Sequence, residues 1–240
     1  MLAGCGRGCK VLAPALTAAV RASITSAMVD ESKGQRFWNR FARRYAAARI
    51  RDEAGYERSL ARTIEHIGGL AQVLEIGCGT GLTALRLAGA VGHLTATDFS
   101  ARMIDIARER QAAGEGGNVD FVVASAEALP VKPASCDAVL AFSVLHLLEN
   151  RSETLGRIRS LLKPGGLLVS KTPCMAELQL RYRWMIPLLR ASGLAPRFAM
   201  LTGEALARDV EAAGFEIVET ARHGSGAHDI RLYLVARRSD

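Results

Sequence analysis

The spacing of hydrophobic and polar positions changes several times along the chain and predicts alternating helices and strands. Residues 32–67 carry large apolar side chains mostly three or four positions apart, which predicts a helical segment ending at Gly68 and Gly69. Short apolar runs predict five strands, at 72–76, 94–97, 120–124, 136–142 and 167–171. Helical patterns lie between them, at 83–90, 101–114 and 151–162. This alternation predicts a parallel sheet with right-handed crossovers, and the run 136–142, apolar except for Asp137, predicts a strand buried on both faces.

The alternation breaks after residue 171. Residues 173–200 contain three prolines in an apolar stretch dotted with arginines, which predicts a lid insert rather than a sheet segment. A helix is expected at 202–213, and two strands at 215–220 and 230–236 joined by a turn. We therefore expect one domain over residues 32–240, with the lid inside it.

The first 31 residues differ from the rest and are left out of the expected fold. They are rich in Ala, Ser and Thr, carry a few basic residues, and contain no acidic residue before Asp30. This composition suits a disordered tail, translation from a start upstream of Met28, a mitochondrial transit peptide or a weak secretory signal. We expect a cytoplasmic protein, or a mitochondrial one if the segment is a transit peptide.

Composition narrows the class of protein. Of 240 residues, 49% are hydrophobic and 23% are charged, as in ordinary globular proteins, and no apolar run approaches the roughly 20 residues of a membrane span. The five cysteines have no zinc-site pairing, so we expect reduced thiols and no metal. Much of the net charge of +7 lies in residues 36–62, which contain eight arginines and only three carboxylates. This excess suits a solvated helix face, or attraction to an anionic substrate or a membrane surface.

The strongest chemical signal follows the first predicted strand. Gly77, Gly79 and Gly81 alternate with Cys78 and Thr80 before a predicted helix, a pattern typical of a backbone that approaches a ligand closely or makes a tight turn. A dinucleotide loop would place its last glycine one position later, and a phosphate loop would end in Gly-Lys-Ser/Thr. The spacing therefore favours another ligand.

A carboxylate at the end of the second strand sharpens this interpretation. Asp98 follows Gly81 by 17 residues, where a carboxylate can accept both ribose hydroxyls of an adenosine. Asp98 could instead cap the following helix, a role for which Ser100 competes.

Together these residues make the chain resemble the class I S-adenosylmethionine-dependent methyltransferases, in particular the small-molecule group with the ubiquinone- and menaquinone-type enzymes. Five motifs in order carry the resemblance: 73–81, 97–100, 126–130, 136–139 with 144–146, and 162–166. The resemblance implies an α/β fold: a Rossmann-like sandwich with a seven-stranded, mostly parallel sheet, an antiparallel last strand and an N-terminal helical cap.

The resemblance also implies roles for individual residues. Glu75 and the loop at Gly77, Cys78, Gly79 and Gly81 would hold the methionine part of S-adenosylmethionine. Asp98 would bind its ribose, Phe99 would pack on the adenine, and Ser125 with Ala126 would meet the adenine edge. Ser125 departs from the family, which commonly has an aspartate there, and a neutral hydroxyl makes a weaker hydrogen bond. The other implied cofactor contacts are Tyr45, Met103, Glu127 and Phe142.

The catalytic machinery is harder to identify from the sequence. The sulfonium supplies an activated methyl group, so a base is needed only for an acceptor that carries a proton. His146 follows the fourth strand, near the expected ligand crevice, and is the candidate base or substrate contact, although it could merely pack locally. Cys174 also lies near this crevice but is more typical of a core residue.

The interpretation is therefore a methyltransferase acting on a small hydrophobic or amphipathic acceptor, with peripheral membrane association as an option. An RNA methyltransferase and a non-catalytic S-adenosylmethionine-binding protein are the alternatives. Nucleic acid is disfavoured as a partner because no additional binding domain is visible, and the sequence does not fix the oligomeric state.

Overall fold

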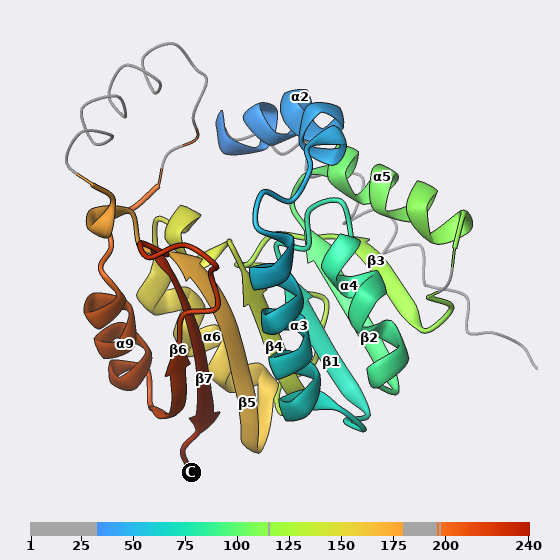
Figure 1. Cartoon of the computed structure of the whole chain (residues 1–240). Coiled ribbons are helices and arrows are strands. Elements are labelled where there is room, and N and C mark those ends of the chain that lie inside the picture. The colour runs from blue at the N-terminus through green and yellow to red at the C-terminus, as the bar shows by residue number, and fades with distance from the viewer. Residues whose placement is uncertain (1–32, 115, 180–195, 197) are drawn as a thin grey trace, which may run out of the picture. The chain divides into compact units, whose positions relative to one another are not determined.

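A seven-stranded sheet forms the centre of the fold (Figure 1). The computed structural model describes residues 33–114, 116–179, 196 and 198–240. The strand order is β3-β2-β1-β4-β5-β7-β6; β1 to β5 are parallel, and β7 is antiparallel to both neighbours. The strands are β1 (Gln72–Ile76), β2 (His93–Asp98), β3 (Val119–Val123), β4 (Cys136–Phe142), β5 (Leu162–Pro173), β6 (Phe215–Ala221) and β7 (Arg231–Arg238). The expected α/β architecture is confirmed, including the antiparallel last strand.

Helices cover both faces of this sheet because its strands expose apolar side chains on both sides. Two apolar clusters result, one joining the sheet to α3, α4 and α5, and the other joining it to α6 and α9. The elements on the first face are α3 (Glu53–Ile67), α4 (Leu82–Leu87), the 3-10 turn η1 (Ala88–Ala90) and α5 (Ala101–Ala112). Those on the second are α6 (Arg151–Leu161) and α9 (Gly203–Ala212).

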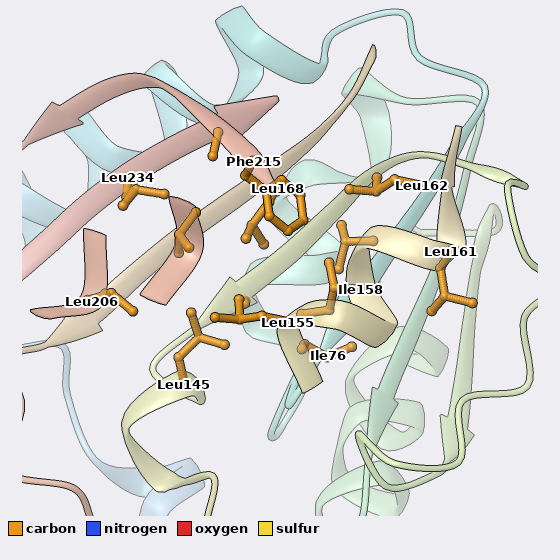
Figure 2. Close-up of a cluster of buried hydrophobic side chains, with 14 of the residues drawn as sticks. Ile76, Leu145, Leu155, Ile158, Leu161, Leu162, Leu168, Leu206, Phe215 and Leu234 are labelled. Carbon is orange, nitrogen blue, oxygen red and sulfur yellow. The ribbon is translucent and has the colours of Figure 1, made fainter. Parts of the chain in front are cut away.

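The second cluster shows how the hydrophobic pattern specifies packing (Figure 2). Leu155 and Ile158 of α6 lie three residues apart on one helix face and are fully buried against the sheet. Leu168 of β5 is also fully buried, and Leu206 reaches the same cluster from α9. Truncating one such leucine to alanine would cost about 2–5 kcal/mol, because lost transfer energy and a cavity add.

The segment predicted as helical over 32–67 divides into two helices, α2 (Lys33–Ala47) and α3. The break at 48–52 arises because Asp52 caps α3, with its carboxylate accepting a hydrogen bond from the Gly55 backbone amide at 3.0 Å. The spacing of large apolar residues lengthens to five and six positions on the two sides of Ile50, a signal of the interruption that the prediction of one helical segment passed over.

One other predicted boundary changes, and one predicted segment is largely outside the described residues. The turn predicted at 164–166 lies within β5, which begins at Leu162 and pairs there with Cys136 across a register irregularity. Most of the predicted lid, at 180–195 and 197, lies outside the described residues. In the described part of the chain, no helix combines the length and apolar character needed to cross a bilayer.

Candidate S-adenosylmethionine site

The loop after β1 requires glycine for both its conformation and its packing. Gly77 and Gly81 adopt positive φ angles of 65° and 77°, which side chains disfavour. A Cβ on Gly77 would also lie 2.7 Å from Cγ2 of Val144, and one on Gly81 would lie 2.7 Å from Cβ of Ala107. The turn geometry expected from the sequence is present, and close packing against neighbouring elements adds a second constraint.

Asp98 connects this loop to the end of β2. Its side chain is 6% exposed, and its two carboxylate oxygens each accept a backbone hydrogen bond at 2.9 Å, from the amides of Gly79 and Ser100. Burial raises the pKa of Asp98, while these two hydrogen bonds oppose the rise. Ser100 itself caps α5 by accepting a hydrogen bond from the Met103 amide at 3.2 Å. Asp98 is therefore not needed as the helix cap.

Glu75 is a buried carboxylate with an unsatisfied oxygen. The residue is 1% exposed, and Oε2 has no hydrogen-bond partner among the described residues. Burial, followed by the nearby charge of Asp98, raises the pKa of Glu75 to about 8. An unsatisfied buried acceptor is costly, so a cationic donor supplied by a ligand would be strongly favoured here.

The sheet register brings these carboxylates to one side of the sheet. Glu75 pairs with Ala96 of β2 and with Leu140 of β4. Asp98 and Phe142 lie two residues beyond these partners, and side chains two positions apart in a strand share a face. Glu75, Asp98 and the half-buried Phe142 therefore occupy the same face, at the carboxyl ends of three adjacent strands.

Helix α2 is attached to the loops of this site by polar contacts that the sequence did not predict. Gln35 donates a side-chain hydrogen bond to the Phe99 carbonyl at 2.9 Å, and Asn39 Oδ1 accepts one from Ser100 Oγ at 2.6 Å. Both contacts come from positions four apart in α2, hence from one helix face.

Arg110 of α5 makes a further link at the end of α2. Its guanidinium donates to the Ala46 carbonyl at 3.0 Å and to Oγ1 of Thr80, within the glycine loop, at 2.6 Å. The sequence does not predict this bridge, because Arg110 lies 64 and 30 residues from its two partners.

Tyr45 lies at the same loop. Its Cε1 would be 3.7 Å from a Cβ placed on Gly79, and its ring packs edge to face against Trp38, with centroids 5.9 Å apart. Partial burial and the charges of Asp98 and Glu75 raise the pKa of Tyr45. The side chain nevertheless remains 52% exposed. This position suits the predicted role of a residue closing over the cofactor.

Of the residues predicted to contact the adenine, only some lie near Asp98. Ser125 and Ala126 are half-buried, and the Ala124 amide just before them donates to the Asp98 carbonyl at 3.0 Å. Phe99 is half-buried beside Asp98, whereas Glu127 is exposed. Their cofactor contacts stay predictions.

Met103 occupies a different environment from the other predicted contacts. It is 2% exposed in a small cluster with Ala42 of α2 and Ile106 of α5. The structure accounts for Met103 by helix packing, and its contact with the cofactor stays a prediction.

His146 lies in the 3-10 turn η2 (Leu145–Leu147), just after β4. Its Nδ1 is buried without a hydrogen-bond partner among the described residues, and burial lowers the pKa of His146 to about 4. The imidazole is therefore neutral at pH 7 and has a free lone pair or N–H, according to tautomer. Burial raises the pKa of the Cys78 and Cys174 thiols, which keeps both protonated and disfavours them as nucleophiles.

Comparisons with known proteins agree with this geometry. A solved magnesium protoporphyrin IX methyltransferase from Synechocystis PCC 6803, with S-adenosylhomocysteine bound, superposes with a TM-score of 0.62. The alignment covers 87% of this chain and 95% of that protein at 21% identity, a level that shows the fold. The likeness shows that the chain shares the Rossmann-like fold of that methyltransferase. Residues 73–166 match a family described as a methyltransferase domain.

Relatives match over part of their length. Demethylmenaquinone methyltransferase of Clavibacter sepedonicus is 35% identical over 109 residues, 45% of this chain and 43% of the relative. Ubiquinone biosynthesis O-methyltransferase of Methylocella silvestris is 39% identical over 105 residues, 42% of this chain and 39% of the relative. Compactin nonaketide synthase, polyketide synthase component, of Penicillium citrinum is 39% identical over 119 residues, 46% of this chain but 4% of the relative. The chain thus matches less than half the length of each relative.

Proposed function

We propose that this protein transfers a methyl group from S-adenosylmethionine to a small hydrophobic or amphipathic acceptor. The observation that carries the proposal is the buried Oε2 of Glu75, close to Asp98 at the glycine loop, for which the described residues supply no hydrogen-bond partner. An amino acid ammonium would satisfy Glu75, and a ribose diol would match the acceptor oxygens of Asp98. The residues present therefore fit an adenosyl amino acid.

The protein's own contribution would be binding, alignment and exclusion of water. When bound, S-adenosylmethionine supplies a methyl group already activated by a positively charged sulfur. Glu75, Asp98 and the loop amides would fix the orientation of the cofactor, so that an acceptor can approach in line. Tyr45 and α2 would cover the site and reduce the access of water.

His146 would contact the acceptor. Its neutral imidazole at pH 7 can take a proton from an acidic acceptor such as a phenol, or donate a hydrogen bond to it. A pKa of about 4 makes it a poor base for an aliphatic alcohol. The small-molecule relatives, including two quinone-type methyltransferases, support an acceptor of modest size. Peripheral membrane association and a cytoplasmic location stay predictions.

Calorimetric titration of S-adenosylmethionine into the wild-type chain and Asp98→Ala tests the cofactor site. We expect the variant to bind about 30- to 150-fold more weakly, since hydrogen bonds to a charged group contribute about 2–3 kcal/mol here. Asp105→Ala removes an exposed carboxylate from α5 and is the matched control, with unchanged affinity expected. Circular dichroism of all three proteins checks that each is folded.

Methyl transfer from labelled cofactor to quinol, lipid, phenolic and RNA acceptors then tests the activity. Transfer to the small acceptors supports the proposal, and transfer to RNA alone refutes it in favour of an RNA methyltransferase. Cofactor binding without transfer to these acceptors or to any cell-extract component would assign a binding protein. No binding of S-adenosylmethionine by the wild-type chain would refute the whole proposal.

A further inference from the structure

Helix α2 carries two adjacent rows of side chains with different environments. One row, at every fourth position, packs against α5 through contacts with Met103 and Ile106. Its members are Trp38, Ala42 and Ala46. The second row precedes it by one residue and is wholly aromatic: Phe37, Phe41 and Tyr45. Positions four apart lie on one helix face, so the aromatic row forms a continuous strip beside the packed face.

The aromatic row is not explained by the described hydrophobic core. Phe37 and Phe41 stack on each other, with ring centroids 4.5 Å apart and planes inclined by 22°. Both are partly exposed, and neither belongs to the clusters of buried residues formed by the described part of the chain. Two phenylalanines kept at a partly solvated surface indicate a surface that another apolar group covers.

The aromatic row ends at the cofactor loop. Tyr45, its last member, is the residue that lies against Gly79. The hydrogen bonds of Gln35 and Asn39 to the loop after β2 fix the rotation of α2, and so fix the direction of the aromatic row. Phe37 and Phe41 therefore continue a surface that begins at the proposed methyl donor.

We propose that Phe37 and Phe41 form a wall of the acceptor site and select acceptors with a flat, unsaturated ring. This inference rests on the proposed function, because it places the acceptor beside the bound cofactor. Flat rings stack on aromatic side chains in offset geometry and gain more than a saturated ring of equal size. The exposed residues Arg40 and Arg44 occupy positions bordering the row, so a ring with an anionic substituent fits best.

The test compares two soluble probes of equal carbon skeleton, 2-naphthoate and decahydro-2-naphthoate, by calorimetry with S-adenosylhomocysteine bound. We expect the wild-type chain to prefer the flat naphthoate. The double variant Phe37→Leu/Phe41→Leu keeps an apolar surface but removes both rings, and we expect it to lose about tenfold in naphthoate affinity with little change for the saturated probe. Ile50→Ala, an exposed apolar residue outside the row, is the control.

Affinity for S-adenosylhomocysteine, measured on the same samples, separates the two proposals. Unchanged S-adenosylhomocysteine affinity with a lost preference for naphthoate supports the acceptor wall, since a misfolded variant would lose both. Equal binding of the two probes by the wild-type chain, or a preference that survives the double substitution, overturns the inference and leaves the proposed function standing. Failure of the wild-type chain to bind S-adenosylhomocysteine refutes both.

An anionic membrane is the competing occupant, because aromatic and arginine side chains also bind lipid interfaces. Sedimentation with phosphatidylglycerol vesicles distinguishes it. Vesicle binding that is lost in the double variant, with an unchanged preference for naphthoate, would assign the row to the membrane and overturn the inference.

Discussion

The unusual state of Glu75 predicts that cofactor binding changes the protonation of the protein. With a pKa of about 8, Glu75 is mostly protonated at pH 7 in the free protein. A bound ammonium would favour the ionised carboxylate and lower this pKa, so binding must release the proton. The fraction protonated at pH 7 sets the release from Glu75 at about 0.9 proton, falling to about 0.1 at pH 9.

The cofactor's amino group contributes the opposite change. An α-amino group has an ordinary pKa of about 7.7 to 8.0, so it must take up about 0.1 proton at pH 7 and about 0.9 at pH 9 to bind as the ammonium. The net change is thus a release of about 0.8 proton at pH 7 and an uptake of about 0.8 at pH 9, with the sign reversing near pH 8. Affinity is greatest near pH 8 and about threefold weaker one pH unit to either side.

Calorimetry in buffers of different ionisation enthalpy measures this proton count directly. Glu75→Gln, which cannot ionise, is the matched variant: we expect no release at pH 7, retained uptake at pH 9, and weaker binding throughout. A wild-type chain that releases no proton at pH 7, or a variant that releases as much as the wild type, would refute the reasoning that Glu75 binds the ammonium.

Three substitutions test other parts of the fold. Gly77→Ala should lower the free energy of unfolding by about 2–4 kcal/mol in denaturant titrations, because of its positive φ and the clash with Val144, and an unchanged value would contradict the loop geometry. Arg110→Met should cost about 1–3 kcal/mol and speed amide exchange at the end of α2, whereas unaltered exchange would argue against the bridge. Burial lowers the pKa of Lys171 to about 8, a penalty present below pH 8 and lost as pH rises to about 10.5. Wild-type stability should therefore rise relative to Lys171→Met over that range, and a constant difference would exclude the shift.

The strands were the most predictable part of the fold. Gln72–Ile76 and Cys136–Phe142 were predicted at their observed bounds, because each is a short apolar run bounded by polar or turn residues. The break before Asp52 was missed although the apolar spacing lengthens there, and although Asp followed by Glu is itself a helix-start signal. The start of β5 was missed because pairing of Leu162 with Cys136 depends on a neighbouring strand.

Only the residues at the strand ends of the site could be predicted from the sequence. Glu75 and Asp98 lie near the carboxyl ends of β1 and β2, and the parallel pairing of these two strands places them together. Asn39 and Arg110 reach the site from helices distant in sequence, and their partners depend on how those helices pack. Lysine in a sequence is expected at the surface, yet Lys171 is 8% exposed and donates a hydrogen bond to Ser59 Oγ at 2.6 Å. Burial of this kind follows from tertiary structure.

The hydrogen bonds of Asn39 and Arg110 join the helix above the site to the segments that would hold the nucleoside, and this shared framework links two binding equilibria. A ligand that ordered the loop would also order the helix, and this would reduce the entropic cost of binding the second ligand. Such cooperativity would be reciprocal: the acceptor would increase the affinity for the nucleoside by the same factor as the nucleoside increases the affinity for the acceptor.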